Sequence, residues 1–125
     1  MIKFTIPIAP ISKKNSQRIF RPNGMNRPII VPSAKYKQYE RDAMRFIPKG
    51  RCIDEPVNIK CLFYMPTRRK VDLTNLLEAI DDVMVTAGLL ADDNSNIVES
   101  HDGSRVLYDK ENPRTEIHIT PYWDV

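Results

Sequence analysis

The chain has 125 residues, of which 42% are hydrophobic, and this size suits one compact domain with a modest core. Its two cysteines, Cys52 and Cys61, are too few for a disulfide scaffold, and no apolar run is long enough for a secretory signal or a membrane span. We therefore expect a single domain over residues 1–125, in the cytoplasm and without a membrane partner.

The net charge of +3 conceals two halves of opposite sign. Residues 1–51 contain twelve lysines and arginines against two acidic residues, a balance of +10. Residues 52–125 contain seven lysines and arginines against fourteen acidic residues, a balance of −7. This division suits a protein that contacts a polyanion with one half and gathers carboxylates in the other, but charge alone fits two ordinary solvated surfaces equally well.

The first third of the chain predicts a strand, a long loop and a helix. The N-terminal segment has the alternation of a half-buried edge strand, with an apolar side made of Ile2, Phe4, Ile6 and Ile8. Residues 9–32 are rich in proline and basic residues and predict an irregular loop. Ser33 fits the N-cap of a helix that runs from about Ala34 to Phe46.

The middle of the chain predicts the clearest elements. Residues 57–65 alternate so that one face of a strand is wholly apolar, and the segment from Pro66 to Lys70 then forms a basic turn. A helix follows between Asp72, which fits its N-cap, and Gly88, which fits the position after its end. The apolar stripe of this helix consists of Leu73, Leu76, Leu77, Ile80, Val83, Met84 and Ala87.

The last third predicts two strands joined by turns. A polar turn at residues 92–96 leads into a strand from about Ile97, in which Gly103 marks a bend or a bulge. A second turn precedes a final strand that includes Ile117 and Ile119. The resulting order, β-α-β-α-β-β, predicts an α/β (α+β) fold, a two-layer domain in which a small mixed sheet packs against two main helices.

Acidic residues mark both ends of the second predicted helix, with Asp72 before it and Asp92-Asp93 after it. A helix of about sixteen residues is about 24 Å long, so local geometry alone does not bring these ends together. Taken singly, Asp72 is typical of a helix cap and Asp92-Asp93 of a turn. Asp81 and Asp82 fit a solvated helix face.

The order of these residues resembles the RusA family of Holliday junction resolvases. The family motif is Asp-x-Asp-Asn-Leu with a lysine soon after, then a helix, a glycine and an Asp-Asp pair. This sequence is similar to it in a basic turn, Asp72, Asn75, Gly88 and Asp92-Asp93. The segment over residues 10–16 is similar to the family's Pro-x-Ser-x-Asn start. The resemblance covers nearly the whole chain and is strongest over residues 68–98.

The resemblance implies a homodimer that cuts Holliday junctions, which are four-way branched DNA, with Mg²⁺ held by three aspartates. Carried over to this chain, Asp72 and Asp93 match metal-binding aspartates. Thr74 replaces the second aspartate of the motif, and Glu78 replaces its lysine. Because residues four apart share a helix face, we expect Glu78 to restore the missing carboxylate. Thr74, Glu78 and Asp92 then support a catalytic site built on the two metal ligands.

Basic and amide residues flank this cluster and suit a phosphate backbone. The predicted nucleic-acid-binding residues are Lys13, Lys14, Asn15, Arg68, Arg69, Lys70 and Asn75. The leading hypothesis is a Mg²⁺-dependent endonuclease that resolves Holliday junctions by paired nicks, in DNA recombination and repair. The departures at Thr74 and Glu78 leave two alternatives open, a non-catalytic module that binds branched DNA and a nuclease for other nucleic-acid structures.

Overall fold

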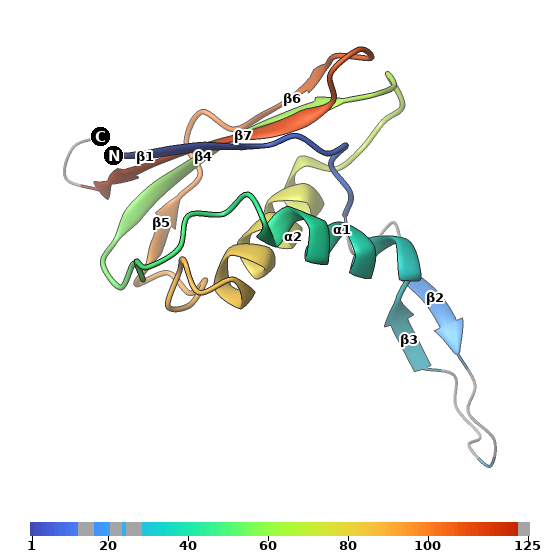
Figure 1. Cartoon of the computed structure of the whole chain (residues 1–125), viewed down its shortest axis with the longest axis horizontal. Helices are drawn as coiled ribbons and strands as arrows, with labels where there is room; N and C mark the ends of the chain where they lie inside the picture. The colour runs from blue at the N-terminus through green and yellow to red at the C-terminus, as the bar shows by residue number, and fades with distance from the viewer. Residues whose placement is uncertain (13–16, 21–23, 25–28, 123–125) are drawn as a thin grey trace.

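The computed structural model describes residues 1–12, 17–20, 24 and 29–122, with the backbone alone for residues 17–20 and 29–32. In this described part a five-stranded sheet packs one face on two helices, which gives two layers (Figure 1). The elements of these layers are β1 (Ile2–Ile6), α1 (Ala34–Met44), β4 (Val57–Met65), α2 (Leu73–Thr86), β5 (Val98–Ser100), β6 (Arg105–Tyr108) and β7 (Arg114–Pro121). The predicted class, a mixed sheet packed on two helices, is confirmed.

Strand β4 is the centre of the sheet. On one side it pairs antiparallel with β7, which in turn pairs antiparallel with the edge strand β1. On the other side it pairs in parallel with β5 near its start and with β6 near its end. The strand predicted from Ile97 is therefore two short strands, and Gly103 lies between them with a positive φ of 88°.

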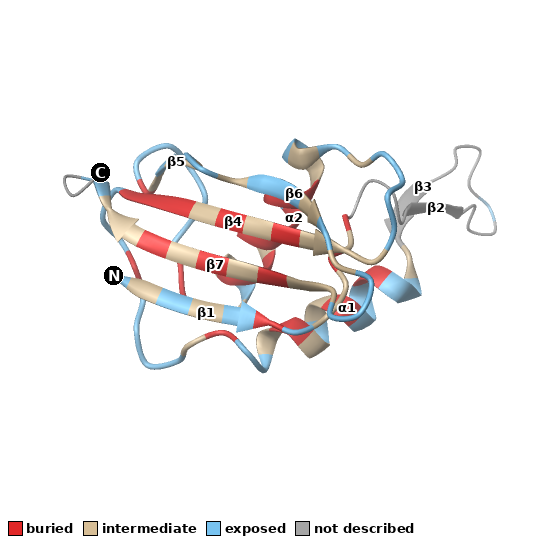
Figure 2. Ribbon diagram, turned by 90° about the horizontal axis from the view of Figure 1, so that it is seen from above, coloured by how far each residue is buried: buried red, intermediate tan, exposed pale blue. Residues whose placement is uncertain are grey.

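The alternation of β4 decides which face of the sheet is covered. Ile59, Cys61 and Phe63 are buried on the side of the helices, so Cys61 is a core residue. The register places three buried residues of β7 opposite them, namely Ile119, Ile117 and Thr115. In Figure 2 the opposite face of the sheet looks toward the viewer, and both helices lie behind it.

The prediction of an irregular loop over residues 9–32 is wrong at residues 17–20 and 29–32. Strands β2 (Gln17–Phe20) and β3 (Ile29–Pro32) form an antiparallel pair that extends away from the sheet and the helices (Figure 1). The β-branched residues of β3 favour a strand. The density of prolines over the whole segment conceals this pairing in the sequence.

Helix α1 begins where the sequence predicts and ends two residues before Phe46. The hydroxyl of Ser33 accepts a hydrogen bond from the backbone N–H of Tyr36 (3.1 Å) and caps the first turn. Tyr36, Tyr39 and Ala43 recur at helical spacing and are buried. The backbone N–H of Phe46 bonds to the carbonyl oxygen three residues back, and this tighter turn ends the helix.

Helix α2 buries its apolar stripe against the sheet. Its buried residues include most of the predicted stripe, namely Leu76, Leu77, Ile80, Val83 and Met84. Gly88 follows the helix with a φ of 85°, as predicted for the residue after its end. One carboxylate shares the buried side, because Asp81 is only 7% exposed, and the prediction that Asp81 is solvated is wrong.

Neither helix of the described part is both long and apolar enough to cross a membrane.

Asp81 is buried because it has a partner at the sheet edge. Its Oδ2 lies 2.8 Å from Nε2 of His101, whose Nδ1 donates to the carbonyl oxygen of Ile59 (2.9 Å). A carbonyl oxygen can only accept a hydrogen bond, so Nδ1 of His101 carries a proton. The hydrogen bond between Nε2 and the Asp81 carboxyl group contains a second proton. Burial lowers the pKa of His101, but the hydrogen bond and the charge of Asp81 outweigh it and raise that pKa. Burial raises the pKa of Asp81, and His101 offsets part of this rise.

Side chains bridge the interruption between β5 and β6. The side-chain oxygen of Asn58 accepts the backbone N–H of Asp102 (2.8 Å) and the hydroxyl of Ser100, and its amide donates to the carbonyl of Asp102 (3.2 Å). The hydroxyl of Ser104 accepts the backbone N–H of Cys61 (2.9 Å). These bonds replace the backbone ladder along β4 and hold the turn that carries the imidazole.

The pair of Asp81 and His101 predicts an asymmetric mutational response. His101→Leu alone should destabilise the fold by about 3–5 kcal/mol in urea unfolding at about pH 7, because it leaves a buried carboxylate without a partner. Its stability should recover as the pH falls below about 7, because burial already raises the pKa of Asp81 and its protonated form carries no charge. The double variant Asp81→Leu/His101→Leu should lie close to the wild type. If both variants lost the same free energy of unfolding at every pH, the pair of Asp81 and His101 would contribute only packing volume.

Candidate active site

The polar face of α2 carries acidic and amide side chains along its length. Asn75, Glu78 and Asp82 recur at spacings of three and four residues, opposite the buried stripe, and Asp72 precedes the helix at its N-cap. Asp72 is exposed and makes no capping hydrogen bond. Its carboxylate instead accepts a hydrogen bond from the side-chain amide of Asn75 (3.2 Å). The predicted N-cap position is confirmed, and its carboxylate remains exposed to ligands.

The chain after α2 forms a tight acidic turn. Beyond Gly88 it follows the sheet edge, where Leu90 forms a parallel bridge with Ile53. Asp92 then accepts hydrogen bonds from the backbone N–H of Asp93 (2.7 Å) and from the amide of Asn94 (3.0 Å). These two bonds, in this order, lower the pKa of Asp92. Asp92 therefore stabilises the turn, and the side chain of Asp93 is available for contacts outside the turn.

Asp93 meets Asp82 of α2. Partial desolvation raises the pKa of Asp93 although its side chain is exposed, the nearby side chains of Asp92 and Asp82 raise that pKa further, and a backbone hydrogen bond offsets part of the rise. Two carboxylates at this separation repel each other unless a proton or a cation lies between them. The sequence prediction assigned Asp82 to a solvated helix face and left it out of the site. Its spacing of four from Glu78 is the one signal in the sequence that places it on the acidic face.

Tyr36 of α1 lies near two carboxylates of α2. Its ring is buried in α1, and burial raises the pKa of its hydroxyl. The charges of Glu40, Asp82 and Glu78 raise this pKa further. Glu78 and Asp82 therefore lie near Tyr36, as does Glu40 of α1 itself. The predicted carboxylate at Glu78 thus lies on the same side as Asp82.

The predicted site residues fall into two groups along α2. Ten residues separate Asp72 from Asp82, which corresponds to about 15 Å along the helix axis. Asp72 and Asn75 lie at the helix start, and Thr74 is exposed there, one turn before Glu78. The second group lies further along the helix and consists of Glu78, Asp82, Asp92 and Asp93. Within the described ranges, no three His, Cys, Asp or Glu side chains stand close enough to hold one metal ion together.

A basic loop leads from β4 into the first acidic group. Arg68, Arg69 and Lys70 are exposed in this loop, immediately before the helix cap. The guanidinium of Arg68 lies 4.0 Å from the ring centroid of Tyr108. The other predicted DNA-binding residues, Lys13, Lys14 and Asn15, lie outside the residues that the structure describes, so their role stays a prediction.

Comparison with known proteins decides the family. Residues 7–120 match the family model described as endodeoxyribonuclease RusA. The chain is also 31% identical over 105 residues to the crossover junction endodeoxyribonuclease RusA of Aquifex aeolicus (strain VF5), an alignment that covers 82% of this chain and 79% of that protein. The chain belongs to the RusA family of endodeoxyribonucleases. The RusA match includes β4, the basic loop, α2 and the acidic turn, so it contains both acidic groups.

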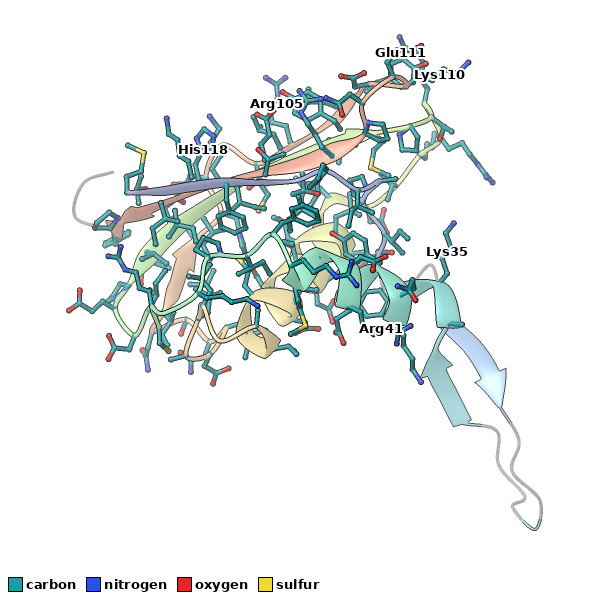
Figure 3. The ribbon with its side chains drawn as sticks, in the orientation of Figure 1. Lys35, Arg41, Arg105, Lys110, Glu111 and His118 are labelled. Carbon is teal, nitrogen blue, oxygen red and sulfur yellow. The ribbon has the colours of Figure 1, made fainter. Side chains whose placement is uncertain are left out.

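The contact between Asp82 and Asp93 predicts a measurable change in proton affinity. Asp82→Asn removes a negative charge beside Asp93, so the pKa of Asp93 should fall, although the part of the rise caused by burial should remain. Carbon-13 NMR titration of the carboxyl groups measures this directly. Glu111→Gln is the charge-matched control, because Glu111 projects from the turn after β6, at the far end of the sheet (Figure 3). A pKa of Asp93 that is equal in all three proteins would contradict the contact.

Proposed function

We propose that this RusA-family protein resolves four-way DNA junctions by paired, Mg²⁺-dependent nicks, as a homodimer, in DNA recombination and repair. The observation that carries the proposal is the match of residues 7–120 to the RusA family, within which Asp93 lies beside Asp82 of α2. The name of the Aquifex relative, a crossover junction endodeoxyribonuclease, supports branched DNA as the substrate.

The chemistry of the donors fits a hard divalent cation. Mg²⁺ prefers oxygen ligands and is usually held by one or two carboxylates, with water and substrate phosphate completing its shell. Desolvation, then Asp92 and then Asp82 raise the pKa of Asp93, so Asp93 and Asp82 are two neighbouring carboxylates whose like charges a bound cation would offset. These two residues would hold the ion. Asp72, which the resemblance also assigns to the metal, lies at the other end of the same helix face, and its assignment stays a prediction.

The residues of the chain have separate tasks in this proposal. When bound, Mg²⁺ polarises the scissile phosphate and lowers the pKa of an attacking water. Asp92 holds the turn so that the neighbouring carboxylate faces α2. Glu78 adds negative charge to the same side, where the family motif has lysine. Asp72 is exposed at the helix start, directly after the basic loop, where a phosphate backbone would pass.

The basic loop positions the DNA. Arg68, Arg69 and Lys70 are three exposed cations on consecutive residues, and contacts of this kind fix the register of a protein on DNA without reading its sequence. A four-way junction has two strands to cut, and a twofold homodimer presents two equivalent sites to them. Paired nicks then follow from symmetry, with one acidic site acting on each strand.

Cleavage of a synthetic four-way junction in Mg²⁺ tests the proposal. The wild type should make two symmetric nicks. Asp93→Asn and Asp82→Asn should each slow cutting by at least about 100-fold, because each removes a metal ligand. Their binding to the junction should be unchanged or tighter, because a negative charge near the phosphates is lost. Asp72→Asn tests the predicted ligand at the other end of the helix, and Glu111→Gln is the control.

The results also separate the alternatives. Junction binding without Mg²⁺-dependent cutting by the wild type would identify a binding module, to which the replacements at Thr74 and Glu78 point. Cutting of flaps or RNA hybrids in preference to junctions would identify a nuclease for other structures. Wild-type rates in both Asp93→Asn and Asp82→Asn would remove the proposed metal site.

A further inference from the structure

Two arginines stack on tyrosines at the end of the sheet where β4 leads into the basic loop. The guanidinium of Arg114 lies 3.7 Å from the ring centroid of Tyr64, and that of Arg68 lies 4.0 Å from the ring centroid of Tyr108. Tyr64 lies next to the last residue of β4, and Tyr108 ends β6, the strand paired with it. The two stacks are chemically alike, so their surroundings decide what each contributes.

The stack of Arg114 on Tyr64 is satisfied within the protein. Arg114 forms ion pairs with Asp109 (2.9 Å) and Glu116 (2.8 Å), and its side chain is only 18% exposed. Two carboxylates therefore neutralise this cation and hold it in place. Such a stack contributes to the structure of the turn between β6 and β7 and leaves little charge for a ligand.

The stack of Arg68 on Tyr108 has the opposite surroundings. Arg68 is exposed, and no carboxylate of the described residues forms an ion pair with it. Tyr108 remains 40% exposed beneath it, and Val106, two residues earlier on the same side of β6, is 36% exposed. An apolar strip with an uncompensated cation over it thus lies open at the sheet edge.

This combination fits a nucleotide. A guanidinium that lies flat on a ring keeps the N–H groups of its edge free for a phosphate. An exposed aromatic ring offers a face or an edge for stacking with a nucleobase, whatever its sequence. Four residues separate Arg68 from Asp72 and span at most about 14 Å, so a base held here would lie near the first acidic group.

We propose that Arg68 and Tyr108 form a stacking platform for one unstacked nucleobase at the branch point of a DNA junction. The inference rests on the proposed function, because only branched or otherwise opened DNA offers such a base. Bases inside a continuous duplex are stacked on their neighbours and do not reach the platform. The platform therefore favours branched over duplex DNA, which phosphate contacts alone do not do.

Binding of a four-way junction and of a duplex with the same arm sequence, both without divalent metal, provides the test. Tyr108→Ala should weaken junction binding by roughly 5- to 150-fold, the range for loss of one base stack, and should leave duplex binding unchanged. Tyr108→Phe keeps the ring and should stay within about threefold of the wild type. Tyr122→Ala is the matched control, because Tyr122 is 48% exposed but follows β7 at the other end of the sheet.

Photo-crosslinking places the base. A junction with 5-iododeoxyuridine at the branch point should crosslink to Tyr108 of the wild type, and the same base within an arm should not. Equal losses for junction and duplex in Tyr108→Ala, or crosslinks that lie elsewhere, would overturn the platform while leaving the proposed function intact. A wild type that binds the junction no better than the duplex would overturn the platform and the proposed function together.

Discussion

The rotation of α2 about its axis is the constraint on which the acidic site depends. Its apolar stripe is buried against the sheet, and Asp81, on the flank of that stripe, is held by His101 at the sheet edge. Successive residues of a helix lie about 100° apart, so a buried Asp81 turns Asp82 away from the buried stripe, to the side where Asp93 lies. A different rotation would bury Asp82 or direct it away from Asp93.

The interrupted edge of the sheet serves this same arrangement. A continuous strand along β4 would direct successive side chains alternately to the two faces of the sheet. The break between β5 and β6 instead forms a turn, fastened by Asn58 and Ser104, from which His101 reaches both the carbonyl of Ile59 and the carboxylate of Asp81. A positive φ at Gly103 permits that turn. The edge of the sheet lacks part of its backbone hydrogen bonding to β4. In exchange, the contact between His101 and Asp81 fixes the orientation of α2.

Local patterns in the sequence predict those parts of the fold that local physics decides. The alternation of β4, the stripe of α2, the cap at Ser33 and the glycine after α2 are all confirmed, because each depends on neighbouring residues. The pairing of β2 with β3 was not predicted, since proline density masks two strands of four residues.

The site depends on longer-range contacts than the fold does. Asp81 and Asp82 look alike in the sequence, yet one contacts a histidine twenty residues away and the other meets Asp93. The path of the chain after Gly88 decides both outcomes, and it is set by the bridge between Leu90 and Ile53. The resemblance to the RusA family identified Asp93 and Asp72 as candidate metal ligands. It did not identify Asp82, because Asp82 is not part of the recognised motif.

The most direct test of the central claim, that Asp82 and Asp93 hold a cation between them, is a titration of the protein with Mn²⁺ followed by NMR. Mn²⁺ accepts the same carboxylate ligands as Mg²⁺ and broadens the signals of nearby nuclei. The account predicts that the amide signals of Asp82 and Asp93 broaden first, before that of Asp72, and that Asp93→Asn abolishes this order. Broadening that centres on Asp72 while Asp82 and Asp93 stay sharp would contradict it.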